Sequence, residues 1–299
     1  MRHPSFLGGS GVPSSQGPAT TIAFVLAFAS SLLYGAGDFF GGIASRRARV
    51  LAVTLLSQAA GLAALVIAAL VVGGTPPAEA WPWAIGAGLF GSTGVLLFYR
   101  ALAIGTVSIV APVTSAVALC VPVAAGLAWG DRPGLLPLAG IALAPFAVAL
   151  VGSGEGRGGA AQAGRALLLA VVSGAIIGGF LVGIGRLPAG GGLWPLAIAR
   201  AAGTLTIAAA ALVRREPPRV PSNAWAPILG CALFDVTANV CFRFAAAGAP
   251  LSLVATIVSL APASTVLLAQ LVLHERLSVR QKAGVALALA AIVLLAQPS

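Results

Sequence analysis

The sequence predicts an all-α membrane protein in which ten transmembrane helices form a 5+5 inverted repeat around a central cavity. Composition, the spacing of apolar stretches and an internal duplication each indicate this fold class. Hydrophobic residues make up 59% of the 299 residues, charged residues make up only 8%, and the mean hydropathy is +1.02. Such a chain has too little polar surface to cover a water-soluble globule. We therefore expect it to lie in a lipid bilayer.

The apolar residues fall into ten stretches, each close to the length of about 20 residues that crosses a bilayer as a helix. None shows the period-2 alternation of a membrane β-barrel. The first stretch is longer than the core of a signal peptide, so we interpret it as a permanent span. Residues 1–19 are rich in Gly, Pro and Ser and are expected to form a disordered tail. The expected helices are 20–43, 50–73, 82–104, 106–129, 134–152, 166–185, 193–213, 225–246, 250–272 and 280–297.

The two halves of the chain match when the sequence is slid along itself. We interpret residues 20–152 and 166–297 as copies of one five-helix unit, joined by a linker over 153–165. Because five is an odd number, the second copy enters the bilayer from the opposite side, as in the inverted repeats of alternating-access transporters. An offset of 143 residues, which becomes 144 after one inserted residue, aligns Ser30 with Ser173, Gly35 with Gly178, Arg100 with Arg243, Asp131 with Glu275 and Gly140 with Gly284.

Two of the aligned residues, Asp131 and Glu275, stand in a repeated turn before the last helix of each half. A carboxylate at this place complements the positive end of the helix that follows and can pair with the next residue, which is Arg132 or Arg276. We therefore interpret the repeated turn as structural.

Basic residues outnumber acidic residues by 17 to 7, which gives a net charge of +10. In a soluble chain this excess would suggest a nucleic-acid partner, but here most of the arginines follow odd-numbered spans, so we expect no nucleic acid. By the positive-inside rule the side that carries them is cytoplasmic, and both termini then lie outside.

Three segments carry a resemblance to a known family. FYRALAIGTVSIVAP in the first half, FRFAAAGAPLSLVA in the second, and the acid-Arg turn before a helix that starts at glycine are similar to the drug/metabolite transporter superfamily, EamA-type branch. The resemblance implies a multi-pass protein of the inner membrane that exports amino acids or related metabolites, and the type it most resembles is the YddG-type aromatic amino-acid exporter. It also implies cytoplasmic termini, in contrast to the charge count. Tyr34-Gly35 stands where the family commonly has Trp-Gly.

Ionisable side chains inside the predicted spans are the candidate functional residues, because each costs at least about 2.5 kcal/mol in a bilayer and needs a partner or a water-filled cavity. Asp38 follows Tyr34 by four residues, so the two share a helix face. Asp38 and Asp235 align with Leu181 and Ser92 of the other repeat, so the duplication does not account for them. We expect the substrate-binding or cavity residues to be Tyr34, Asp38, Ser92, Asp235 and Asn239, with Arg100, Arg200 and Arg243 as gate or structural charges.

These assignments have structural alternatives. Asp38 is alternatively a helix-end residue or one half of a structural ion pair, and Arg100 and Arg243 are alternatively snorkelling anchors. Asp235 begins a polar stripe with Asn239 and Arg243, which faces either the substrate cavity or a structural partner such as Arg200. Prolines inside predicted spans are hinges for a rocking motion or static kinks. They are Pro112, Pro122 and Pro262.

The sequence predicts a secondary transporter with a small-molecule substrate and the lipid bilayer as its partners. It has no HExxH motif, no nucleophile with a usable histidine and no paired metal ligands, so we expect no catalysis, no metal and no other cofactor. It has no Walker motif, so the energy source is expected to be proton exchange, substrate exchange or none. The alternatives are a non-catalytic membrane scaffold and a transporter of another substrate class, such as drugs or sugars.

Overall fold

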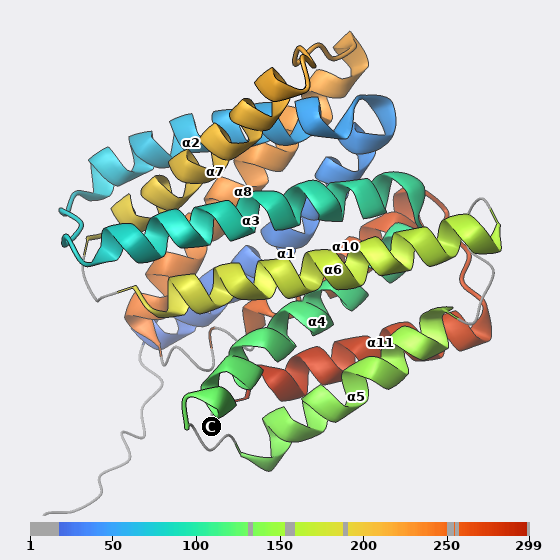
Figure 1. Ribbon diagram of the computed structural model, residues 1–299. Coiled ribbons are helices and arrows are strands. Elements are labelled where there is room, and N and C mark those ends of the chain that lie inside the picture. Colours follow the sequence, from blue (N-terminus) through green and yellow to red (C-terminus); the bar gives the residue numbers. More distant parts are fainter. Residues whose placement is uncertain are drawn as a thin grey trace, which may run out of the picture.

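The computed structural model describes residues 18–130, 134–152, 159–187, 191–249, 254 and 257–297, and the regular structure in these ranges is helical (Figure 1). It confirms the predicted all-α fold with two halves. The helices of the first half are α1 (Pro18–Arg47), α2 (Val50–Val72), α3 (Ala80–Ile104), α4 (Val107–Ala128) and α5 (Leu135–Gly152). Those of the second half are α6 (Ala160–Gly185), α7 (Trp194–Val213), α8 (Ser222–Gly248), α10 (Ala261–Val272) and α11 (Val279–Leu295).

Seven of these helices, α1 to α4 and α6 to α8, are long and apolar enough to cross a membrane. Within the described ranges, α5 and α10 contain shorter apolar helices. A chain with this many spans is a multi-pass membrane protein.

Two helices begin inside segments that were predicted to be a tail and a linker. α1 begins at Pro18, inside the predicted tail, whose residues 1–17 lie outside the described ranges. α6 begins at Ala160 rather than at 166, so the last part of the predicted linker is helical, while residues 153–158 of the linker lie outside the described ranges.

The single helix predicted over 250–272 is wrong in its described part. A turn at Ser259 and Leu260 precedes α10. Pro262 explains the break, because it has no N–H to donate to the preceding turn and its ring would clash with the carbonyl four residues earlier in a continuous helix. Pro262 instead lies in the first turn of α10, where a missing N–H costs nothing. Pro262 therefore does not lie in the interior of a helix, as the sequence predicted, and a hinge role for it stays a prediction.

Helix contacts occur in pairs, as a two-fold relation between the halves requires. α1 packs along α8, and their repeat mates α6 and α3 also pack along each other. α3 packs on α7 as α2 packs on α8, and α4 packs on α6 as α10 packs on α1. α2 contacts its own mate α7, and α5 contacts α11. In Figure 1, α1 ends and α6 begins at the right-hand end of the bundle, so the two copies are inverted.

Serines that the sequence aligned make equivalent contacts in the two halves. Ser30 Oγ of α1 donates to Ala238 O of α8 at 2.8 Å, and Ser173 Oγ of α6 donates to Gly94 O of α3 at 2.9 Å. Both serines are fully buried. The duplication read from the sequence is thus visible as matched hydrogen bonds between helices.

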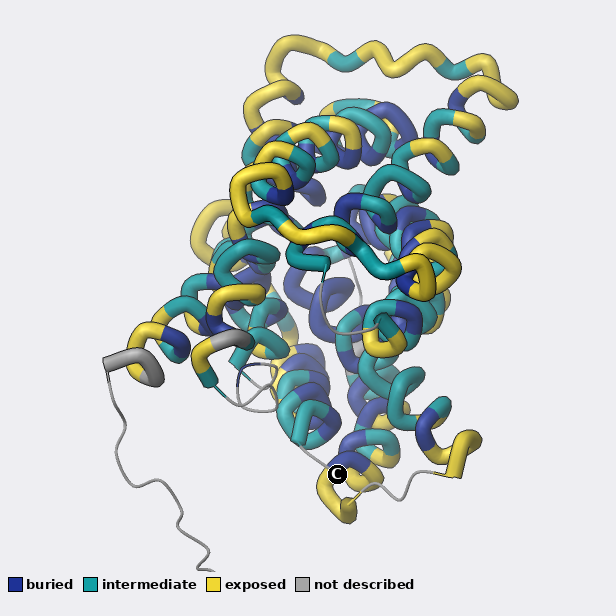
Figure 2. The backbone as a smooth tube through the Cα atoms, turned by 90° about the vertical axis from the view of Figure 1, so that its left-hand side faces the viewer, coloured by how far each residue is buried: buried dark blue, intermediate teal, exposed yellow. Residues whose placement is uncertain are grey.

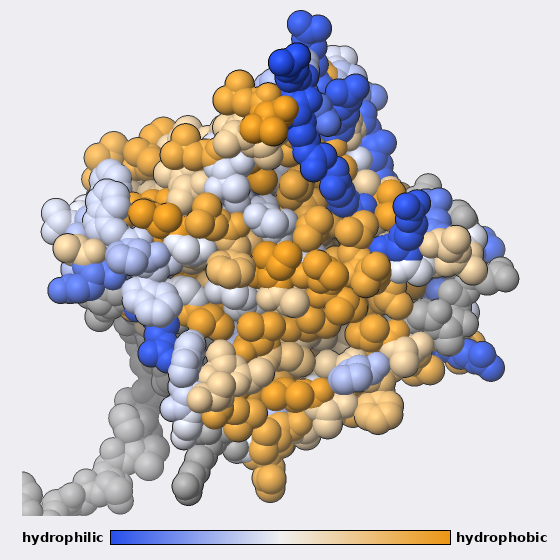
Figure 3. All heavy atoms as spheres, in the orientation of Figure 1, coloured by the Kyte–Doolittle hydropathy of each residue, from blue (hydrophilic) through white to orange (hydrophobic). Residues whose placement is uncertain are grey.

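Apolar side chains cover the outside of the bundle as well as fill its interior. The buried segments gather at the centre in Figure 2, and the exposed ones lie at the periphery and the connections. Figure 3 shows a broad hydrophobic belt, with hydrophilic residues gathered toward the end where α1, α3 and α7 end. Large exposed hydrophobic residues include Phe28, Phe146 and Leu205. In water this surface would favour aggregation, but in a bilayer it is the surface that contacts lipid.

In the second half, the acidic residue of the repeated turn does not cap the helix that follows it. α11 is capped by Ser278, which forms a capping box with Gln281. Glu275 instead accepts hydrogen bonds at the first turn of α4 and pairs with Arg46 of α1. The predicted role of Glu275 is therefore wrong, and Asp131 lies outside the described residues.

Gly35 marks a close approach between α1 and α10. A Cβ atom at this position would lie 2.5 Å from Ala261 O and would overlap the Ser264 hydroxyl. The aligned Gly178 stands in the same relation to α4, where a Cβ would lie 2.7 Å from Ala118 O. A repeated glycine thus marks a repeated contact in which two helix backbones approach closely.

Replacing Gly35 by alanine is expected to lower the free energy of unfolding by about 1–3 kcal/mol, because the backbone of α10 cannot rotate away from the added methyl group. Thermal unfolding in detergent measures this loss. Gly164→Ala is the matched control, since a Cβ at that helical position meets nothing within 4 Å, and it should leave the melting temperature unchanged or slightly raised. Equal melting temperatures for the two variants would contradict the close packing.

Candidate functional site

An ion pair between α7 and α8 is the centre of a polar cluster inside the apolar bundle. Arg200 Nη2 pairs with Asp235 Oδ2, and Arg200 Nη1 donates to Gln58 Oε1 of α2 at 3.1 Å. Gly61 of α2 leaves room for the guanidinium, since a Cβ there would lie 3.2 Å from Nη1. The side chains of Arg200 and Asp235 remain 19% and 30% exposed. Part of each charged side chain therefore remains accessible in the structure.

Asn239 extends the cluster by one turn of α8. Its Nδ2 donates to Asp235 O at 2.7 Å and lies 3.5 Å from Asp235 Oδ2. The predicted stripe continues to Arg243, but this residue is exposed and forms no ion pair with any described residue. The structure thus pairs Asp235 with Arg200, as one of the sequence alternatives required, and leaves Arg243 out of the cluster.

Asp38 adds a second carboxylate from α1. α1 approaches α8 closely at Gly37, where a Cβ would lie 3.5 Å from both Asp235 N and Cys231 O. Asp38 is half-buried and interacts electrostatically with Asp235. Among the described residues, none donates a hydrogen bond to its carboxylate or forms an ion pair with it. Arg200 compensates the charge of Asp235, whereas the ionised form of Asp38 has no ion-pair partner among the described residues.

Two tyrosines border this charge. Tyr34 is half-buried and lies close enough to Asp235, Arg200 and Asp38 for their charges to act on it, and its role in substrate binding stays a prediction. Tyr99 of α3 is buried, and its hydroxyl lies 2.9 Å from Cys231 Sγ. Sequence reasoning missed Tyr99.

Gly41 supplies the space that the Tyr99 ring occupies, since a Cβ there would lie 2.5 Å from the ring. The sequence signal for Tyr99 was the FYR segment. Tyr99 directly precedes Arg100 there, so the two side chains lie on different faces of the same helix.

Ser92 and Arg100 lie away from the cluster. Ser92 is buried, donates through Oγ to Leu89 O of its own helix at 3.3 Å and packs against Gly203 of α7. In this structure Ser92 is therefore packed between α3 and α7, apart from the charged cluster, and its cavity role stays a prediction. Arg100 is exposed near the end of α3, at the opposite end of the bundle from its repeat mate Arg243. Both placements agree with the alternative of snorkelling anchors.

Prolines inside helices are Pro112 and Pro122 of α4, as predicted, together with Pro145 of α5 and Pro227 of α8. Each removes a hydrogen bond from its helix and permits a bend. A hinge role for Pro112 and Pro122 stays a prediction.

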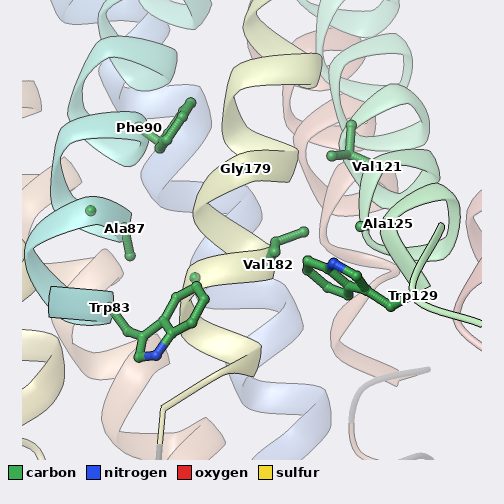
Figure 4. A pocket seen from close by; sticks show the side chains of 10 residues that line it. Trp83, Ala87, Phe90, Val121, Ala125, Trp129, Gly179 and Val182 are labelled. Atoms are coloured by element: carbon green, nitrogen blue, oxygen red, sulfur yellow. The ribbon is translucent and has the colours of Figure 1, made fainter. Parts of the chain in front are cut away.

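A separate pocket of about 330 Å³ lies between α3, α4 and α6 (Figure 4). Trp83 and Trp129 stand on either side of α6. Gly179 and Gly183 of α6 allow Phe90 and Ala87 of α3 to pack closely against it. The guanidinium of Arg186 lies over the Trp129 ring, 3.9 Å from its centroid. The pocket is lined by apolar and small residues, so it has no means of orienting a polar substrate, and the charged cluster is the stronger candidate site.

Comparisons with known proteins agree with the fold and the duplication. Residues 21–153 and residues 164–297 each match the model of the EamA-like transporter family. A crystal structure of a protein that is 19% identical aligns with a TM-score of 0.58, over 94% of this chain and 98% of the other. At this identity the likeness shows the fold alone. No curated protein matches the chain.

Proposed function

The chain belongs to the EamA-like transporter family, and from this premise we propose that it is a secondary transporter of amino acids or related amine-bearing metabolites. In this proposal it exports or exchanges them across the inner membrane by alternating access. Members of the family are membrane transporters of small molecules in the drug/metabolite transporter superfamily, so the proposal concerns the substrate class and the mechanism.

The unmatched carboxylate supports the proposed substrate class. Asp235 is occupied by Arg200, whereas Asp38 has no partner among the described residues. An ammonium group next to Asp38 would neutralise the cluster, and in a site of low polarity this attraction is much stronger than in water. A neutral sugar would leave the charge unmatched, which argues against that alternative.

The remaining donors suit the other end of an amino acid. A guanidinium has five N–H groups, and the contacts of Arg200 with Asp235 and Gln58 use two of them. In this proposal the remaining N–H groups of Arg200 bind the substrate carboxylate. The ring of Tyr34 offers a surface for an aromatic side chain or for the ammonium group itself. Among amino acids, we therefore propose aromatic ones as the first substrates to test.

Counterflow in proteoliposomes tests the proposal. Vesicles loaded with one unlabelled compound are tested for uptake of the same compound in labelled form, across aromatic, other neutral and basic amino acids, an amine-bearing drug and a neutral sugar. We expect accelerated exchange for at least one amino acid and none for the sugar. Exchange of the sugar or of the drug alone would contradict the substrate class, and no exchange of any compound would favour a scaffold. Repeating the assay with a pH gradient shows whether protons are coupled.

A further inference from the structure

A second charged cluster lies at the end of the bundle where α1 and α3 end and α4 begins, on the right in Figure 1. Glu275, in the connection between α10 and α11, accepts hydrogen bonds from Val107 N at 3.0 Å and Ser108 N at 2.9 Å. Its Oε1 also lies 3.3 Å from Arg46 Nη2. These N–H groups belong to the first turn of α4, so the carboxylate complements the positive end of that helix.

Arg46 connects this cluster to the end of α3. Its Nε donates to Leu102 O at 3.1 Å, and its Nη2 donates to Gly105 O at 2.9 Å, where α3 ends. The side chains of Arg46 and Glu275 are only 16% and 7% exposed. One shielded ion pair therefore connects α1, α3 and α4 of the first half with a connection of the second half.

The cluster around Arg46 and Glu275 contains features that are unfavourable while this end of the bundle is closed. His274, directly before Glu275, has a φ of 51°, in the left-handed region that favours glycine. The hydroxyls of Ser45 and Ser108 are buried beside the cluster, and the described part of the chain provides neither with a hydrogen-bond partner. Buried polar groups without partners destabilise a closed state relative to one that admits water.

We propose that Arg46 and Glu275 form a latch that closes this end of the bundle and opens in each transport cycle. The proposal rests on the alternating access proposed above. Arg46 follows Asp38 on α1 by about two helical turns, or about 12 Å. A shift of α1 when Asp38 takes its ligand would therefore reach the latch through one rigid helix.

A thiol at position 108 reports opening. The full chain is placed in nanodiscs with Cys120→Ser, Cys231→Ser, Cys241→Ser and Ser108→Cys, and a charged methanethiosulfonate reagent is added. Ser173→Cys in the same background is the matched control, because Ser108 and Ser173 are both 0% exposed, and Ser173 lies in the α3–α6 interface. We expect modification at position 108 to be at least about tenfold faster than at position 173, since only the latch opens locally. Equal rates would overturn the latch.

Glu275→Gln keeps the size of the side chain and one carbonyl oxygen but removes the charge that pairs with Arg46. We expect it to raise the modification rate at position 108 by about tenfold, by shifting the population toward the open state, and to leave position 173 unchanged. Glu79→Gln, at the exposed start of α3, makes the same chemical change elsewhere and should alter neither rate.

An unchanged rate at position 108 in folded Glu275→Gln protein would identify a static clamp and overturn the proposal. If that variant does not fold, the proposal is tested by the modification rates at positions 108 and 173 in protein that retains Glu275. None of these measurements needs a transported substrate, so a failure of the amino-acid proposal in counterflow leaves the test of the latch unaffected.

Discussion

Asp38→Asn is expected to lower amino-acid counterflow at least about tenfold while the protein stays folded. A carboxylate and an ammonium group 4 Å apart attract each other by about 4 kcal/mol at an effective dielectric constant of 20. A tenfold loss requires only about 1.4 kcal/mol of this. Because Asp38 has no ion-pair partner among the described residues, the neutral amide should leave the melting temperature equal to or above that of the unchanged protein. Counterflow rate and thermal unfolding are measured on the same preparation.

Ser92→Ala is the contrasting variant. Ser92 aligns with Asp235 in the repeat, but its hydroxyl serves only its own helix, so transport should continue at the rate of the unchanged protein. Loss of transport in Ser92→Ala, or an unchanged rate in Asp38→Asn, would show that Asp38 is not where the substrate binds.

Arg200→Met is expected to lower the free energy of unfolding by about 2–4 kcal/mol and to abolish transport. Removing one partner of a fully buried ion pair costs about 3–5 kcal/mol, because the remaining charge has no compensation. The expected loss is smaller here because the Asp235 side chain is 30% exposed. Arg100→Met removes an exposed arginine from α3 and should change stability by no more than about 0.5 kcal/mol.

A double variant separates the structural from the functional contribution of the pair. Arg200→Met combined with Asp235→Leu leaves no unpaired charge at this position, so much of the lost stability should return. Transport should not return, because the donors to the substrate are gone. A double variant that regains transport would show the Arg200–Asp235 pair to be purely structural.

The fold was predictable because it depends on properties that are local in sequence. Span length and hydropathy predict the helices, and the aligned Ser30 and Ser173 or Gly35 and Gly178 predict the two-fold relation, which the structure shows as matched contacts. Pro262 was misplaced because periodicity and hydropathy do not distinguish a proline inside a helix from one that begins it.

The candidate site was only partly predictable because its contacts join distant segments. The cost of burying charge drew attention to Asp38, Asp235 and Arg200, but it left open whether Asp235 faces the cavity or pairs with an arginine such as Arg200. Glu275 serves a helix whose first N–H groups lie 168 and 167 positions away in the sequence, so its role follows from packing alone. For Ser92, alignment within a repeat gives its place on a helix but not whether its neighbours leave space beside it.

The equivalent interfaces α1–α8 and α3–α6 carry different side chains, and this difference has an energetic consequence. A perfect inverted repeat would give the inward-open and outward-open states equal free energies, because the two-fold operation exchanges them. Asp38 and Asp235 on one interface correspond to Leu181 and Ser92 on the other. The exchange therefore places the charges at a different point of the transmembrane electric field. Under alternating access, the resting state of the empty protein is then set by these unmatched charges and by the membrane potential that acts on them.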